Sequence, residues 1–146
     1  NAHSRLTANG VETYYSSERP SSEEADRVAS FENAVIRFDE EEPGPVRVNV
    51  EDILFRFERL RHWKASALAA EGVQASLASS LPLRNRGVQS AGFHVLRSAR
   101  MPALLLEMGF LSHPEEGPML GTDLFQRQMG QSVAESLLLW SGRAHA

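Results

Sequence analysis

The stretch that decides the fold is residues 103–110, ALLLEMGF, in which three consecutive leucines end at a glutamate and a glycine follows two residues later. A short, continuous apolar run of this kind is typical of a β-strand covered on both faces, because such a strand has no solvent side to carry polar residues. Glu107 interrupts the run close to its carboxyl end. We therefore predict a buried strand over residues 103–110 with a carboxylate near its end.

The rest of the chain alternates between strand and helix patterns. β-branched and aromatic residues predict strands over residues 10–15 and 91–97. Helix caps and apolar spacing predict helices over residues 22–36, 49–79 and 122–141, the second with a break near Trp63. Such alternation indicates one α/β domain over residues 1–146, with three layers and a mostly parallel twisted sheet covered by helices on both faces.

Two local motifs add detail. An acidic stretch with two prolines, residues 39–45, predicts an exposed loop. Ser112 and Glu115 have the spacing of a capping box, which predicts a helix start at Ser112.

Composition excludes several classes of function. The chain has 146 residues, a net charge of −4 and no cysteine. The acidic balance argues against a nucleic-acid partner, which needs clustered Lys and Arg. The lack of cysteine excludes disulfides, thiolate metal sites and a cysteine nucleophile. No apolar run reaches the roughly 18 residues that cross a bilayer, so we expect no membrane span.

Glu107 is the candidate catalytic residue. An ionised carboxylate in an apolar strand is costly unless a cation, a metal or hydrogen bonds compensate it. Near the carboxyl end of a strand, a partly desolvated glutamate is suited to act as a general base. The alternative is a structural glutamate paired with Arg86 or Arg97. The pattern alone does not decide between them.

Other residues give weaker signals. The five histidines lack metal-type spacing, His94 fits a satisfied sheet residue, and His62 fits a solvated helix position. A serine-hydrolase elbow and a phosphate-binding glycine loop are both absent from the sequence.

Several segments in order resemble one protein family. Residues 86–97, RGVQSAGFHVLR, and residues 102–116, PALLLEMGFLSHPEE, are similar to two late motifs of the amidase-3 class of N-acetylmuramoyl-L-alanine amidases. Residues 1–2, NA, and residues 10–15, GVETYY, are similar to an earlier strand and loop of that family, and residues 32–33 fit the helix that follows. The resemblance covers nearly the whole chain.

The resemblance implies a phosphorylase/hydrolase-like fold and a zinc enzyme. Such an enzyme cleaves the amide between N-acetylmuramic acid and L-alanine in peptidoglycan, for cell-wall remodelling or cell separation. Its zinc is held by two histidines and a glutamate, and a late glutamate, matched here by Glu107, serves catalysis. The substrate implies a periplasmic or secreted location. The expected partners are the stem peptide and the glycan, with an activator protein as a further candidate.

The resemblance does not include the zinc ligands of the family. Aligned without gaps, the family's last zinc histidine falls two positions before Asn1, and the other two ligands fall further upstream. We therefore assign no metal ligand and no cofactor-binding residue within the chain, and expect the N-terminal part of the domain to lie upstream. His3 as a substitute ligand would require a shortened loop.

Residues 38–64 resemble an insert that in some relatives covers the active site. Core packing of the stripe formed by Ile53, Phe57 and Leu60 is the alternative for its helix. An occluding helix would need a carboxylate from Glu51, Asp52 or Glu58.

Two other functions stay open. One is a non-catalytic, metal-free fragment or peptidoglycan-binding remnant of the same fold. The other is an unrelated α/β hydrolase or interaction domain, which the missing nucleophile motifs disfavour.

Overall fold

The structure, a computed structural model, describes residues 7–34, 50–97 and 100–144. Its strands are β1 (Val11–Ser16), β2 (Asn85–Ala91) and β3 (Leu105–Met108). Its helices are α1 (Glu23–Ala34), α2 (Val50–Ser80), α3 (His94–Arg97), α4 (Glu116–Leu120) and α5 (Asp123–Ala144). Among these helices, none is long and apolar enough to cross a membrane.

The three described strands form one mixed sheet in the order β2-β1-β3. The central strand, β1, runs parallel to β2 and antiparallel to β3. The α/β class is therefore confirmed, but β3 departs from the parallel arrangement. As a result, the carboxyl end of β3 lies beside the amino end of β1.

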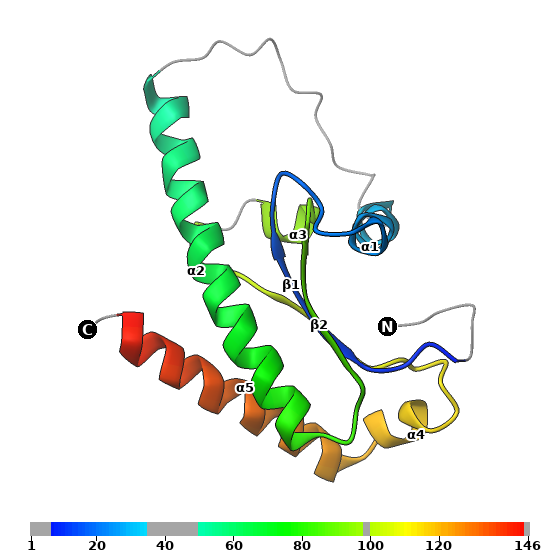
Figure 1. The fold of residues 1–146 in the computed structure, drawn as a ribbon. Coiled ribbons are helices and arrows are strands. Elements are labelled where there is room, and N and C mark those ends of the chain that lie inside the picture. Colours follow the sequence, from blue (N-terminus) through cyan, green and yellow to red (C-terminus); the bar gives the residue numbers. More distant parts are fainter. Residues whose placement is uncertain (1–6, 35–49, 98–99, 145–146) are drawn as a thin grey trace.

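Helices cover both faces of this sheet (Figure 1). One core cluster joins the sheet to α2 and α5, and its buried members are Val11, Val73, Leu77, Leu81, Leu83, Phe125 and Met129. The other joins the sheet to α1 and α3, and its buried members are Tyr14, Ala25, Ala29, Ala91, Phe93 and Leu96. Strand alternation explains the division, because Val11 and Tyr14 lie on opposite faces of β1.

Residues 103–107 are packed on both sides, as the apolar pattern predicts, but they are half-buried rather than buried, and Met108 is exposed. Leu104 and Leu106 pack against the α2–α5 cluster, while Ala103 and Leu105 pack against the α1–α3 cluster. The strand itself is shorter than expected, from Leu105 to Met108. Gly109 ends it with a φ of +99°, which only glycine adopts readily.

The strand expected over residues 91–97 was wrong. β2 occupies Asn85–Ala91, and the chain then leaves the sheet and forms the one-turn helix α3. Asn33 on α1 fixes this turn, since its side chain accepts a hydrogen bond from His94 N at 2.8 Å and donates one to Gly92 O at 2.8 Å. Phe93 and Leu96, three residues apart, are both buried, as a helical turn requires.

Three helix boundaries also needed correction. α2 is continuous, without a break near Trp63, and α5 extends to Ala144 rather than 141. The helix start expected at Ser112 is wrong, because α4 begins at Glu116. Instead, Nδ1 of His113 accepts long hydrogen bonds of 3.3 Å from the backbone N–H groups of Glu115 and Glu116.

Candidate active site

The candidate site lies where β1 begins and β3 ends. Glu12 and Glu107 are directly opposed residues of the antiparallel pair β1–β3. Directly opposed residues place their side chains on the same face of the sheet, with Cβ atoms about 4.5–5.5 Å apart. The fold therefore brings two carboxylates together that are 95 positions apart in sequence (107 minus 12).

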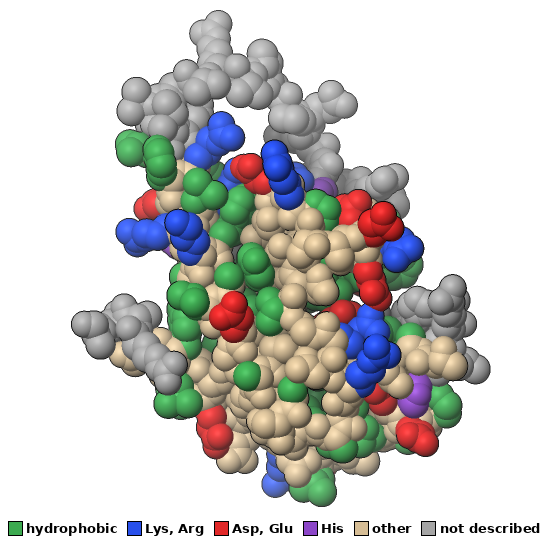
Figure 2. All heavy atoms as spheres, in the orientation of Figure 1, with side chains coloured by type: hydrophobic (Ala, Val, Ile, Leu, Met, Phe, Trp, Pro, Cys, Tyr) green, Lys and Arg blue, Asp and Glu red, His purple; other side chains and the backbone are tan. Residues whose placement is uncertain are grey.

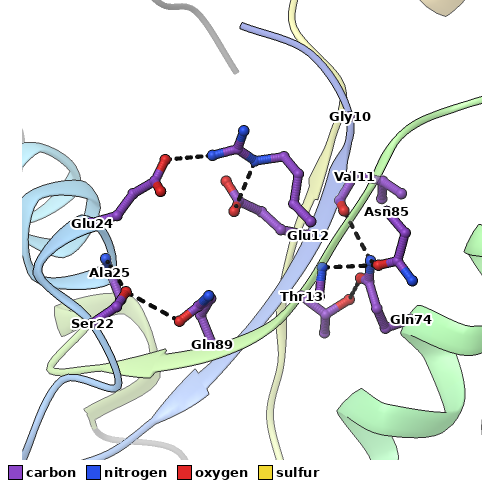
Figure 3. A network of polar contacts seen from close by, with 12 residues as sticks. Gly10, Val11, Glu12, Thr13, Ser22, Glu24, Ala25, Gln74, Asn85 and Gln89 are labelled. Atoms are coloured by element: carbon purple, nitrogen blue, oxygen red, sulfur yellow. Dashed lines mark hydrogen bonds and ion pairs between the residues drawn. The ribbon is translucent and has the colours of Figure 1, made fainter.

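Glu12 is almost fully buried, with 3% of its surface exposed. Its Oε2 atom accepts a hydrogen bond of 3.1 Å from Nε of Arg86. The same guanidinium also binds Glu24 on α1, so Arg86 bridges the sheet to the helix (Figure 3). The other oxygen of Glu12, Oε1, is buried without a hydrogen-bond partner among the described residues.

An irregularity in β2 directs Arg86 toward Glu12. Val11 is opposite Asn85 whereas Glu12 is opposite Gly87, so Arg86 is the extra residue of a bulge. Gly87 accommodates the bulge with a φ of +86°. Burial by itself would lower the pKa of Arg86, but Glu12 and Glu24 raise it above its ordinary value, so the guanidinium stays charged.

Glu107 is half-buried, whereas Glu12 is almost fully buried. Burial raises the pKa of the Glu107 carboxyl above its ordinary value, and the charges of Glu32 and Glu12 raise it further. Desolvation and a like charge both disfavour the ionised form of a carboxyl group. A carboxyl group whose pKa is raised is better suited to accept a proton and return it than one with the ordinary value.

Tyr14 follows Glu12 on the same face of β1 and is fully buried. Its ring meets Phe93 edge to face, with centroids 4.9 Å apart. Burial, and then the charge of Glu12, raises the pKa of Tyr14, so the phenol stays protonated. Its hydroxyl makes no hydrogen bond of ordinary geometry within the described part of the chain.

A third glutamate, Glu116, binds backbone N–H groups next to β1 and β3. Glu116, at the start of α4, is 5% exposed. Its two carboxylate oxygens accept hydrogen bonds from Gly10 N at 2.7 Å and from Phe110 N at 2.9 Å. Glu116 thereby connects the residue before β1 to the loop after β3, and holds both segments around the Glu12–Glu107 pair.

Polar groups on the opposite face of β1 form hydrogen bonds with Gln74 of α2 (Figure 3). The amide of Gln74 accepts a bond from the Thr13 hydroxyl at 2.8 Å. It donates to Val11 O at 2.9 Å and to the side chain of Asn85 at 2.7 Å. This network connects α2, β1 and β2.

The structure places the sequence-predicted residues as follows. Glu107 lies near the carboxyl end of β3, as expected, but because β3 is antiparallel this end lies beside the amino end of β1 and not with the carboxyl ends of the parallel strands. Its catalytic role stays a prediction. Arg86, one of the two cations considered for Glu107, contacts Glu12 and Glu24 instead. His94 is half-buried at the start of α3 and not within a strand. His62 is half-buried on α2.

Sequence reasoning missed Glu12 and Glu116. The signal for Glu12 was available, because it is the charged residue within the apolar and β-branched segment of residues 10–15. Glu116 carried no comparable signal, since it follows Glu115 in a polar loop, and only the fold distinguishes the exposed Glu115 from the buried Glu116.

A hollow of about 560 Å³ lies elsewhere, between α2 and α5. Its walls include Leu68, Leu139 and Trp140, and its two carboxylates, Glu71 and Glu135, are exposed. It lacks the opposed, desolvated carboxylates of the sheet edge, so we place the candidate site at Glu107 and not in this hollow.

A zinc site is not formed by the described residues. Within residues 7–34, 50–97 and 100–144, no group of three His, Cys, Asp or Glu side chains could hold a metal ion. His3, the substitute ligand considered above, lies outside these residues. The described side chains therefore do not fit the metal by themselves.

The described part of the possible insert, residues 54–64, lies away from Glu107. α2 runs antiparallel to β1: Arg59 forms an ion pair with Glu18, beyond the carboxyl end of β1, whereas Gln74 contacts the amino end. The first half of α2 projects past the sheet at the end opposite α4 (Figure 1). Glu58 belongs to this half, while residues 38–49 lie outside the described part of the chain.

Hydrophobic side chains are exposed on that projecting half. Leu54, Phe55, Phe57 and Leu60 have exposed fractions of 46% to 66%. Figure 2 shows hydrophobic groups along α2 in the same orientation as Figure 1. The expected core packing of Phe57 and Leu60 is therefore wrong, because their stripe extends beyond the sheet and meets no described element.

Comparison with known proteins gives a consistent assignment. The family described as Amidase_3, N-acetylmuramoyl-L-alanine amidase, matches residues 1–138. A probable cell wall amidase, LytH of Staphylococcus saprophyticus, is 37% identical over 68 residues, which cover 47% of this chain and 23% of that protein.

Solved structures with the same fold include the N-acetylmuramoyl-L-alanine amidase of Clostridium difficile 630, with 24% identity and a TM-score of 0.60 over 97% of this chain and 54% of that one. The CwlD amidase of Clostridioides difficile, solved in complex with the GerS lipoprotein, has 15% identity and a TM-score of 0.61 over 97% and 51%. The chain thus spans about half the length of these structures. Its match over residues 1–138 shows that the chain belongs to the amidase-3 family of N-acetylmuramoyl-L-alanine amidases.

Proposed function

We propose that this chain supplies the second half of the catalytic domain of a zinc-dependent N-acetylmuramoyl-L-alanine amidase, with Glu107 as its general base. The substrate is the amide bond between N-acetylmuramic acid and L-alanine in peptidoglycan. The observation that carries the proposal is the half-buried Glu107 carboxyl group of an amidase-3 chain, which lies opposite the buried Glu12 in the β1–β3 register and whose pKa is raised by burial.

The reaction assigns two proton transfers to Glu107. Its carboxylate takes a proton from the attacking water as the water oxygen forms a bond to the amide carbon. The carbon–nitrogen bond then breaks, and the proton passes from Glu107 to the leaving nitrogen of L-alanine. The products are the lactyl carboxylate of the muramic acid and a stem peptide with a free amino terminus.

Zinc is part of the proposal through the family alone. Because the described residues do not form a metal site, its ligands would come from outside them, and we derive no step through the metal. The periplasmic or secreted location and the role in wall remodelling or cell separation follow from the proposed substrate. An activator protein is a further proposal; among structural relatives, CwlD was solved with a lipoprotein.

The test is a peptidoglycan digest with zinc supplied, analysed by mass spectrometry of released stem peptides. It compares the 146-residue chain and a longer protein that contains it with the Glu107→Gln variant of each. We expect Glu107→Gln to reduce release by about 10²–10⁴-fold, the usual contribution of a general base. Glu115→Gln, at an exposed glutamate, is the matched control and should retain full activity.

Equal release of stem peptide by the parent and by Glu107→Gln would show that Glu107 takes no part in the reaction. The second candidate function, a metal-free remnant that binds peptidoglycan, is favoured by the lack of a three-ligand group among the described residues. Zinc measured per chain in the longer protein separates the two candidates: about one equivalent supports the enzyme, and none supports the remnant.

A further inference from the structure

The two oxygens of the buried Glu12 carboxylate differ in their hydrogen bonding. Oε2 is bound by Arg86, while Oε1 is buried without a hydrogen-bond partner among the described residues. A buried, unpartnered carboxylate oxygen is costly, so such an atom needs a proton donor, a water molecule or a cation. On this face of the sheet the Tyr14 phenol adjoins Glu12 and Glu107 lies opposite it, so both are candidate proton donors.

Glu107 is the titratable group opposite Glu12 in the β1–β3 register. Side chains of directly opposed residues are near neighbours on one face of the sheet. When protonated, Glu107 can donate a hydrogen bond toward Oε1 of Glu12. When ionised, it places a second negative charge beside a carboxylate that cannot move away, because Arg86 holds it.

The other ionisable groups near this pair of carboxyl groups come from β1, β2, α1 and α4. From β1, Tyr14 is protonated and neutral; from β2, Arg86 is directed to Glu12 and Glu24. From α1, Glu32 adds a further negative charge that acts on Glu107. From α4, Glu116 is occupied by Gly10 N and Phe110 N. The charge that is both buried and opposite Glu107 is therefore that of Glu12.

We propose that Glu12 is a positioning residue for the amidase reaction: held by Arg86, its fixed negative charge keeps a proton on Glu107 up to a higher pH and so adjusts Glu107 for proton transfer. This inference rests on the proposed function and extends it to a second residue. Glu12 acts through Glu107, and Arg86 acts by fixing Glu12 in place.

The first experiment does not need activity. The side-chain carboxyl ¹³C signal of Glu107 is followed by NMR across pH 3 to 9 in the parent chain and in Glu12→Gln. We expect the titration midpoint of Glu107 to fall by about 0.5–1 pH unit in the variant, because a neighbouring like charge has been removed. Glu23→Gln, at an exposed glutamate on α1, is the control and should leave the midpoint unchanged.

Two further variants separate the effect of the Glu12 charge from an effect on folding. Glu12→Asp keeps the charge, so its midpoint should lie closer to the parent than that of Glu12→Gln. Glu12→Ser removes the charge and leaves space for water, and replaces Glu12→Gln if that variant fails to fold by circular dichroism. A midpoint for Glu107 that stays at the parent value in a folded, charge-free variant would overturn the proposal.

The second experiment measures kcat/KM against pH for peptidoglycan hydrolysis by the longer protein. The acidic limb should move to lower pH in Glu12→Gln by the same amount as the NMR midpoint, since this limb reports the essential base. A shifted midpoint with an unshifted limb would overturn the role of Glu12 in the reaction. A shifted midpoint in a parent with no hydrolysis would refute the proposed function while leaving the coupling of the two carboxylates established.

Discussion

The two faces of β1 bury polar groups in opposite ways. Toward α2, the Thr13 hydroxyl, the Val11 carbonyl and the Asn85 side chain all bond to one amide, that of Gln74. Toward α1 and α3, one carboxylate oxygen of Glu12 and the hydroxyl of Tyr14 are buried without hydrogen-bond partners among the described residues.

This difference separates structure from function. A satisfied network in a low-dielectric interior rigidifies the packing, and Gln74 joins a helix to two strands in this way. Unsatisfied buried groups cost stability and call for an explanation such as a catalytic role. The face with Glu12, Tyr14 and Glu107 is therefore the face on which chemistry is expected, and the following variants test the contrast.

The largest expected effect on stability is that of Gln74→Leu. The substitution keeps a similar side-chain volume but removes the hydrogen bonds of Gln74 to the Thr13 hydroxyl, the Val11 carbonyl and the Asn85 side chain. Asn85 keeps the bond from Gly87 N. We expect the free energy of unfolding to fall by about 2–4 kcal/mol, measured by urea denaturation. Activity per folded molecule should be retained, because the network lies on the face away from Glu107.

Tyr14→Phe is the matched change on the other face. It removes a hydroxyl that makes no hydrogen bond of ordinary geometry within the described part of the chain, so the free energy of unfolding should change by less than about 0.5 kcal/mol or rise. A loss as large as that of Gln74→Leu would show that the Tyr14 hydroxyl is bonded in solution, and the contrast between the two faces would no longer hold.

Glu116→Gln should lower the free energy of unfolding by less than Gln74→Leu does. Glutamine can still accept one of the two backbone hydrogen bonds, but the charge-assisted pair is lost. We expect a decrease of about 1–3 kcal/mol in the free energy of unfolding. Hydrogen exchange should become faster at Gly10 and Phe110 before it does so elsewhere in β1. Unchanged exchange at both amides would contradict the role of Glu116 as the connection between the two segments.

Another small effect is the pH dependence of stability that Glu107 contributes. Because its pKa is raised in the folded chain, the folded state binds a proton more tightly than the unfolded state. The free energy of unfolding therefore decreases as the pH rises from the ordinary carboxyl pKa near 4.5 to the higher value of the folded state. Partial exposure keeps this contribution below about 1 kcal/mol.

Denaturation of the parent and Glu107→Gln at several pH values measures this contribution as the difference between the two curves. The difference should favour the variant progressively above pH 4.5. A difference of opposite sign would mean that the pKa of Glu107 is lowered on folding, and would contradict the desolvated environment assigned to it.

Much of the fold followed from local pattern. The apolar run at Leu104 to Leu106, the β-branched strand before Ser16 and the long helix through Val73 were predicted because burial imposes a fixed periodicity on each element. The assignment failed at Phe93 to Leu96, since four residues are too few for periodicity to distinguish a helical turn from a strand. There, the side chain of Asn33 on a separate helix decides the outcome.

The sequence by itself determined the α/β class, the amidase-3 resemblance and the choice of Glu107, because each depends on residue types at short spacing or in fixed order. Only the tertiary structure decided that β3 runs antiparallel to β1, and hence that Glu107 is opposite Glu12. Only the bulge at Arg86 brings a guanidinium to that buried carboxylate. These relations join residues far apart in sequence, and strand direction and register, which set them, are fixed by packing across the whole sheet.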